Sequence, residues 1–307
     1  MSRRAVRWPG FRSVLCGVDF SEESRRALRH ADVVARHGGG ALKVIYANDP
    51  LLVSAAAAAL HDRGVARRSA AELKTFIAGT LNGAGTPRHV TARAAVGRAS
   101  DVLLEAASHG RSDLIVVGTQ GLTGAERLVL GSTALRILQQ AAVPVLVVPP
   151  AGTPGEGIAA SWPGAEIVAA IELDADGSRE VRHAARIAEW FGASLLLLNV
   201  VEPLPVPRWL KGDLAALERR RLALARRQID RLADLVRNRM ATTTHVMQGR
   251  IADQIAAFAS LERAGLIVTA LRDRAGWFGT ARGSISYHVL SRAAVPVLAY
   301  PPRWRPR

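Results

Sequence analysis

Residues 141–150 read AAVPVLVVPP, and residues 293–302 read AAVPVLAYPP. The second stretch repeats the first at an offset of 152 residues, close to half the length of the chain. The same offset places Gly97-Arg98 on Gly249-Arg250. This period is far longer than the roughly 20 to 50 residues of solenoid repeats. The chain therefore contains a duplicated domain.

The duplication predicts two domains of similar size. The chain has 307 residues, and half of that length is enough for a domain to bury a core of its own. We place the first domain at residues 1–150 and the second at residues 166–307. The residues between them, 151–165, are rich in glycine and proline, which is typical of a linker.

Short apolar runs alternate with segments of helical periodicity in both copies. Runs of consecutive apolar residues indicate strands buried on both faces, as in a parallel sheet covered by helices on both sides. The sequence therefore predicts the α/β class. The expected strands are residues 14–18, 42–47, 90–96, 114–117 and 143–148, then 167–173, 195–201, 244–247, 266–269 and 295–299; the expected helices include 21–36, 51–81, 99–109, 132–142 and 214–236.

The net charge and the cysteine content limit the ligands and the cross-links that the protein can have. Lys and Arg outnumber Asp and Glu by 41 to 26, which gives a net charge of +15. A positive surface attracts polyanions such as nucleotides, nucleic acid or acidic lipid, but charge alone identifies none of them. The single cysteine, Cys16, excludes an intramolecular disulfide.

No segment of the sequence predicts membrane insertion or secretion. No apolar run approaches the ~20 residues that span a bilayer, and residues 1–20 lack the apolar stretch of a signal peptide. We therefore expect a cytoplasmic protein. The helix expected at residues 214–236 carries six arginines. That pattern is found in helices that bind a membrane surface or nucleic acid, and more often in helices with a solvated outer face.

A glycine-rich loop follows the fourth expected strand. Residues 118–133 read GTQGLTGAERLVLGST. Glycines let backbone N–H groups approach a ligand closely, and the hydroxyls of Ser132 and Thr133 lie where a helix N-terminus favours an anion. The loop is not a P-loop, because it contains no Gly-Lys-Ser/Thr. It is not the dinucleotide-binding fingerprint either, because its glycine spacing differs. We predict a phosphate-binding loop; a plain flexible connection is the alternative.

The loop resembles the nucleotide motif of the universal stress protein superfamily. That motif is Gly, two residues, Gly, nine residues, Gly, and then Ser or Thr. Gly118, Gly121 and the pair Gly131-Ser132 match it. Val18-Asp19 after the first strand resembles the opening signature of the family, and the stretch VPVLVV resembles its last strand. The resemblance covers both copies.

The resemblance implies, in each domain, an open five-stranded parallel sheet of strand order 3-2-1-4-5 with helices on both faces. In this order strands 1 and 4 are neighbours at the switch point, where open α/β sheets bind ligands. The resemblance also implies ATP, with or without Mg²⁺, as the ligand. Its expected binding residues are Val18, Asp19, Gly118, Gly121, Arg127, Gly131, Ser132 and Thr133.

The second copy departs from the motif. Ala270 and Asp273 stand where the motif has its first two glycines, and Glu172 replaces the aspartate after the first strand. Only Gly283-Ser284 is retained. A side chain blocks close approach of the backbone, and a carboxylate repels phosphates. We therefore expect one nucleotide per chain, in the first copy.

Apart from this loop, the sequence contains no motif that indicates a catalytic centre. It lacks His-Glu-x-x-His, Gly-x-Ser-x-Gly and Cys-x-x-Cys. We expect a nucleotide-binding protein of the stress response or of signalling, and not a dedicated enzyme. One alternative is a slow ATP hydrolase or a protein that phosphorylates its own Ser132 or Thr133. Another is an interaction module with a basic face for nucleic acid, a partner that we do not expect.

The last strand of each copy is expected at an edge of its sheet. An exposed apolar edge promotes pairing with another strand. Dimers of the family that this chain resembles pair two such strands antiparallel about a two-fold axis. The shared AAVPVL sequence predicts the same contact within one chain, with Val143–Val148 against Val295–Tyr300 as an internal pseudo-dimer. A homodimer formed through the same strands is the alternative.

Overall fold

Two units make up the part of the chain that the structure describes. The first unit comprises residues 1–162 and 299–307, and the second comprises residues 163–298. The sequence assigned residues 299–307 to the second domain, whereas here they group with the first. The computed structural model describes residues 8–59, 64–81, 90–119, 130–150, 162–205, 213–271 and 285–306, with backbone only at 285–287. Most of the predicted linker lies outside these ranges.

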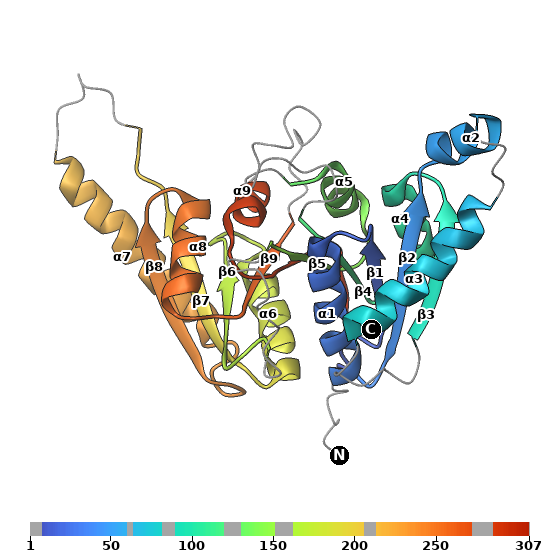
Figure 1. The fold of residues 1–307 in the computed structure, drawn as a ribbon. Helices are drawn as coiled ribbons and strands as arrows, with labels where there is room; N and C mark the ends of the chain where they lie inside the picture. Colours follow the sequence, from blue (N-terminus) through green and yellow to red (C-terminus); the bar gives the residue numbers. More distant parts are fainter. Residues whose placement is uncertain are drawn as a thin grey trace, which may run out of the picture. The chain divides into compact units, whose positions relative to one another are not determined.

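Parallel strands form the sheet of the first unit. They are β1 (Ser13–Val18), β2 (Ala41–Asn48), β3 (Val90–Val96), β4 (Leu114–Gly118) and β5 (Val145–Val148). Their order is β3-β2-β1-β4-β5, which confirms the predicted order 3-2-1-4-5 (Figure 1). β5 begins two residues later than predicted, after Pro144, because proline has no N–H for the ladder.

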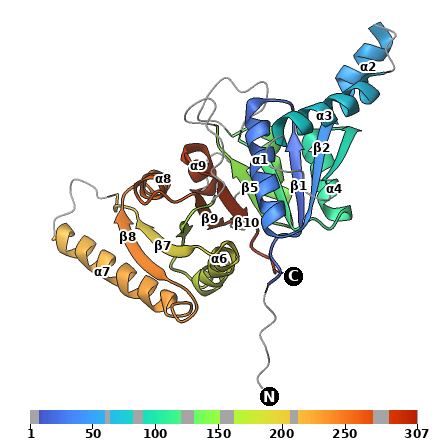
Figure 2. The ribbon, with the colours of Figure 1, turned by 60° about the horizontal axis from the view of Figure 1, so that its bottom comes forward.

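Helices cover both faces of this sheet. They are α1 (Glu22–His37), α3 (Val65–Leu81), α4 (Ala99–His109) and α5 (Ser132–Gln140), while a further helix, α2 (Pro50–Ala59), packs against α3. α1 and α3 pack on one face and α4 packs on the other (Figure 2). α5 packs against α4. Ser21 caps α1 as predicted, since its Oγ accepts the N–H of Ser24 at 3.1 Å. The single helix expected at residues 51–81 is wrong: α3 begins only after Gly64, a residue that disfavours a helix interior.

The second copy of the sequence repeats this architecture. Its strands are β6 (Glu166–Ala170), β7 (Ser194–Val201), β8 (Thr242–Gln248), β9 (Leu266–Ala270) and β10 (Val297–Tyr300), in the order β8-β7-β6-β9-β10. Its helices are α6 (Gly177–Phe191), α7 (Leu214–Ala233), α8 (Ile251–Leu261) and α9 (Ile285–Arg292). α6 and α7 cover one face, and α8, packed on α9, covers the other. β1 and β2 match β6 and β7 at an offset of 153, and the later strands match at 152.

The central strands are buried, as their composition predicts. Val14, Leu15 and Cys16 in β1 and Ile115 and Val116 in β4 are fully buried. Burial of this apolar surface is the main source of folding free energy. It also raises the pKa of the Cys16 thiol far above its ordinary value, because the thiolate would be unsolvated. No helix among the described residues is both long and apolar enough to cross a membrane.

The last residues of the chain pack on the amino-terminal residues of the first unit. The indole of Trp304 lies edge-on to Trp8 at 5.8 Å between ring centroids and stacks with Phe11 at 6.5 Å. Tyr300 approaches the same indole at 5.5 Å. Trp304, Phe11 and Tyr300 are buried. This aromatic cluster explains why residues 299–307 group with the first unit.

Candidate functional site

A cavity of about 310 Å³ in the first unit lies where the strand order reverses. It opens at the carboxyl ends of β1 and β4, which pair in parallel. Among the residues that line it are six of the eight predicted ones: Val18, Asp19, Gly118, Gly131, Ser132 and Thr133. The other two, Gly121 and Arg127, lie outside the described residues.

The rest of the cavity wall consists of residues that the sequence motif does not contain. They are Gly17, Ser24, Ile45, Ala47, Ala99, Leu103, Val117, Thr119 and Ala134. Several of them come from α4 and β2, which carry no part of the glycine motif. Because these residues lie on other elements, the spacing of the motif does not identify them.

The two ends of the glycine loop meet at the cavity. The N–H of Gly131 donates to the carbonyl of Thr119 at 2.7 Å, and the N–H of Thr119 donates to the carbonyl of Val148 at 3.0 Å. α5 starts directly after Gly131, which has no side chain to cap the first turn. The amides of that turn therefore face the cavity region with their N–H groups available for an anion.

Thr119 adds a polar group to the wall. Its side chain is buried, and its hydroxyl oxygen has no hydrogen-bond partner among the described residues. A buried hydroxyl without a partner costs free energy. Such a group beside a cavity fits a site that is completed by a polar ligand or by water.

Asp19 is held in place by the start of α1. Its Oδ1 accepts the N–H of Ser21 at 3.1 Å and the hydroxyl of Ser21 at 2.5 Å. The next residue, Phe20, has a φ of 68°, a value that non-glycine residues rarely adopt and that is typical of functional sites. Its ring lies 4.3 Å from that of Tyr46. Burial, and secondarily the charge of Asp19, raise the pKa of Tyr46.

The described wall of the cavity has no basic side chain. Asp19 is its one charged residue, and none of the described lining residues is Lys or Arg. Backbone amides and hydroxyls are therefore the groups that the described wall offers to an anion. Arg127 is the cation that the sequence predicts at this site, and its position lies outside the described residues.

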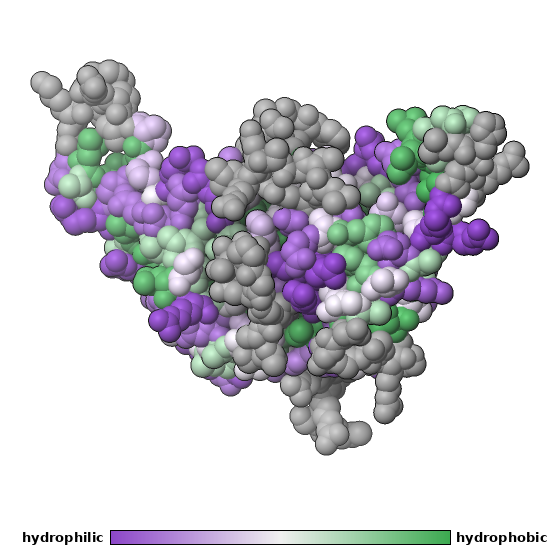
Figure 3. All heavy atoms as spheres, in the orientation of Figure 1, coloured by the Kyte–Doolittle hydropathy of each residue, from purple (hydrophilic) through white to green (hydrophobic). Residues whose placement is uncertain are grey.

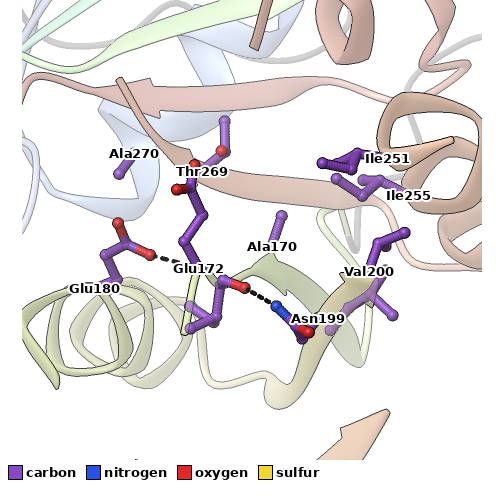
Figure 4. Close-up of a pocket in the computed structure, with 11 residues that line it drawn as sticks. Ala170, Glu172, Glu180, Asn199, Val200, Ile251, Ile255, Thr269 and Ala270 are labelled. Carbon is purple, nitrogen blue, oxygen red and sulfur yellow. Dashed lines mark hydrogen bonds between the residues drawn. The ribbon is translucent and has the colours of Figure 1, made fainter. Parts of the chain in front are cut away.

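The corresponding place in the second unit holds a much smaller cavity, of about 50 Å³ (Figure 4). Ala170, Ile171 and Glu172 line it, at the positions of Gly17, Val18 and Asp19. The backbone N–H of Glu172 donates to Glu180 Oε2 at 3.1 Å. The amide group of Asn199 donates to the carbonyl of Ile171 at 2.9 Å.

Larger side chains narrow the described part of the second cavity. Ile251 stands at the position of Ala99, and Val200 stands at the position of Ala47. The buried carboxylate of Glu180 replaces the methyl group of Ala27. All three larger residues line the second cavity (Figure 4). The second unit thus differs from the first in wall residues outside the glycine motif as well as in the motif itself.

Comparison with known proteins identifies the family. The profile of the universal stress protein family matches residues 10–149 and 165–301. The chain belongs to the universal stress protein family. Both copies match, so it is a tandem two-domain member.

Two curated relatives carry the same family name. A universal stress protein of Mycolicibacterium smegmatis is 25% identical over 301 residues, which cover 94% of this chain and 97% of that protein. A Thermus aquaticus protein, named for its position 3′ of a QAH/OAS sulfhydrylase gene region, is 32% identical over 138 residues. These residues cover 45% of this chain and 98% of that relative.

A solved structure shares the fold along the whole chain. The crystal structure of a universal stress protein from Archaeoglobus fulgidus matches with a TM-score of 0.65 and 17% identity. The match covers 95% of this chain and 98% of that one. A likeness at this identity shows the fold, and it supports the assignment of two tandem α/β domains.

Proposed function

We propose that the first unit binds an adenine nucleotide, ATP with or without Mg²⁺, and that the protein acts as a nucleotide-dependent regulator of the stress response. It acts in the cytoplasm and is not a dedicated enzyme. The observation that carries this proposal is the cavity at the switch point of the first unit, whose wall includes six residues of the predicted site.

Three features support a phosphate-bearing ligand. The cavity volume of about 310 Å³ lies within the range of small-molecule sites, ~300 to 1,000 Å³. The first turn of α5 supplies backbone amides at the wall, and Gly118 leaves room for the ligand because it has no side chain. The resemblance of the glycine motif to that of ATP-binding relatives implies the adenine nucleotide.

The second unit is proposed to bind no nucleotide. Its cavity of about 50 Å³ is too small for a nucleoside, since sites for small molecules start at about 300 Å³. Two carboxylates, those of Glu172 and Glu180, lie at its wall, against Asp19 alone in the described wall of the first cavity, and the additional negative charge disfavours phosphates. The expected stoichiometry is one nucleotide per chain.

Titration calorimetry tests the proposal. We expect the wild-type protein to bind ATP at one site per chain. Gly121→Asp places a carboxylate beside the phosphates and should weaken binding at least tenfold, or by about 1.4 kcal/mol. One solved universal stress protein is described in complex with cAMP, so cAMP, ADP and AMP belong in the ligand panel.

Gly79→Asp is the matched control. Gly79 lies in α3, and a Cβ added there meets no atom within 4 Å, so this variant should bind ATP like the wild type. Unchanged ATP affinity in Gly121→Asp would contradict the site. Two equivalent sites per chain would contradict the asymmetry, and ADP formed at turnover rates would favour the hydrolase alternative.

We also propose that the fifth strands of the two copies pair within one chain as a pseudo-dimer. The shared AAVPVL sequence supports this proposal, because a self-complementary contact needs the same surface on both sides. Cysteines placed at Val147 and Ala299 should cross-link within one chain, which denaturing electrophoresis detects as a faster-migrating monomer. Cross-links that form only between chains would instead indicate a homodimer through these strands.

A further inference from the structure

The outer face of α7 carries a stripe of leucines and arginines, which we call the α7 stripe. Its residues follow each other at spacings of three or four: Leu217, Arg220, Leu224, Arg227 and Arg231. Such spacings place side chains on one face of a helix. Leu217 is 44% exposed and Leu224 is 54% exposed, and the three arginines are exposed as well. Figure 3 shows both apolar and polar residues on the part of the surface that α7 contributes.

The opposite face of α7 fixes the helix on its own unit. Ala225, Ile229 and Ala233 are buried, and the helix packs on β7 and β8. Asp213 caps its first turn by accepting the N–H of Ala216 at 2.7 Å. The 20 residues of α7 extend for about 30 Å. The α7 stripe is therefore presented on a rigid element.

The acidic residues near α7 form ion pairs and hydrogen bonds with residues outside the α7 stripe. Glu218 pairs with Arg221 at 2.9 Å, and Asp213 lies 3.8 Å from Arg219. Asp230 accepts the hydroxyl of Thr244 at 2.6 Å and pairs with Arg237. None of the three arginines of the stripe forms an ion pair with a described residue. The positive charge of the stripe is thus available to a partner.

We propose that the α7 stripe binds the surface of an anionic lipid bilayer. Its guanidinium groups fit phosphate headgroups, while leucines between them gain free energy when they enter the acyl boundary. Nucleic acid offers the same phosphates but no apolar layer for Leu217 and Leu224, so their exposure favours lipid. The net charge of +15 adds long-range attraction to such a surface.

Co-sedimentation with vesicles tests this proposal on the full-length protein. We use sucrose-loaded vesicles of phosphatidylcholine alone and of phosphatidylcholine mixed with phosphatidylglycerol. The wild type should bind the mixed vesicles at least tenfold more tightly, and this binding should weaken as salt is added. The variant R220Q/R227Q/R231Q should lose at least tenfold in affinity, since each basic residue contributes about fivefold near such a surface.

Two matched variants separate the stripe from charge and hydrophobicity in general. R179Q/R237Q/R239Q removes the same charge from arginines that pair with acidic residues, and it should bind nearly as the wild type does. L217Q/L224Q should weaken vesicle binding several-fold. The binding that remains should depend more strongly on salt than that of the wild type. L51Q/L52Q alters exposed leucines of α2 in the first unit and should have no effect. Thermal melting checks that every variant is folded.

Several outcomes would overturn the proposal. One is the absence of binding to the mixed vesicles, and another is an equal loss in both triple arginine variants, which would reduce the effect to net charge. If L51Q/L52Q lost as much vesicle affinity as L217Q/L224Q, the membrane contact would not be specific to α7. If double-stranded DNA displaces the vesicles, and L217Q/L224Q binds that DNA and the vesicles like the wild type, the stripe is a nucleic-acid surface instead.

Discussion

His30 and His183 occupy the same position in the two copies, and both are buried. Burial lowers the pKa of each imidazole to about 4, and neighbouring arginines contribute to the shift. His30 Nδ1 lies 2.9 Å from the carbonyl of Arg26, and its ring meets Trp162 edge-on at 4.9 Å. At neutral pH each histidine is therefore an uncharged part of its core.

We expect these histidines to destabilise the protein on acidification. In the unfolded chain each binds a proton near pH 6.5, whereas in the folded state it does so only near pH 4. Between these values the unfolded state binds more protons, so stability falls as the pH falls. Each histidine should lower the free energy of unfolding by about 1 kcal/mol per pH unit in this window. Urea denaturation across the window measures the slope.

His30→Asn and His183→Asn provide the comparison. Each variant starts from a lower stability at neutral pH and should show a shallower loss on acidification than the wild type. His109→Gln, at an exposed position, should keep the wild-type slope. Equal slopes in all four proteins would contradict the burial-driven shift.

At the scale of single residues, the motif predicted only the part of the site that its own spacing contains. Asp19 and Gly118 lie at the cavity because they end neighbouring strands. Thr119 was missed, since nothing in its sequence context shows that its hydroxyl is buried without a partner. Phe20 was missed too, because a positive φ at an aromatic residue has no sequence signature.

At the scale of elements, α4 and α8 show how one helix controls the volume of a site. Both follow a Gly-Arg pair, and both pack on the strand next to their cavity. Their first residues differ, with Ala99 in α4 and Ile251 in α8. Since both residues line the respective cavities, the larger side chain reduces the space available in the second unit.

Ala99→Ile should reduce the cavity of the first unit as Ile251 does in the second. The added carbons enter the cavity, so we expect ATP affinity to fall at least tenfold in titration calorimetry. The free energy of unfolding should change by less than about 1 kcal/mol, since isoleucine costs about half that in a helix. Ser108→Ile, at an exposed position of the same helix, should leave ATP affinity unchanged. An unaltered affinity in Ala99→Ile would show that the ligand does not occupy this cavity.

Strands and helices were predictable where the apolar pattern was uninterrupted. β3 and α4 have the predicted bounds. The error at residues 51–81 arose because the alanine-rich pattern resumes after Gly64, so periodicity alone did not reveal the break. β5 and β10 begin at Val145 and Val297, later than predicted, because a proline precedes each of them and cannot donate to the ladder.

At the scale of the whole molecule, the duplication predicted both α/β domains. It did not predict that residues 299–307 pack in the first unit. The repeated sequence stops at Pro302, so Trp304 has no counterpart from which its packing could be inferred. Its partners Trp8 and Phe11 also precede the repeated elements. Contacts between two unrepeated termini leave no periodic signal.

Trp304→Ala should destabilise the first unit. It removes a buried indole that contacts both Trp8 and Phe11, and such a truncation costs about 3 to 5 kcal/mol. Cys16 is buried in β1 and is the only cysteine, so its rate of labelling by a thiol reagent reports the opening of this unit. We expect labelling to accelerate at least tenfold. Trp190→Ala, in the second unit, is the control, and wild-type labelling in Trp304→Ala would contradict the role of the cluster.

The return of residues 299–307 to the first unit bears on how the protein is synthesised. A ribosome adds about 5 to 20 residues per second, so residues 163–298 take on the order of ten seconds to emerge after the first unit is almost complete. During that interval Phe11 lacks the indole that later covers it. Until Trp304 has been synthesised, the nascent first unit therefore leaves part of Phe11 uncovered, and a truncation shortly before Trp304 would make that exposure permanent.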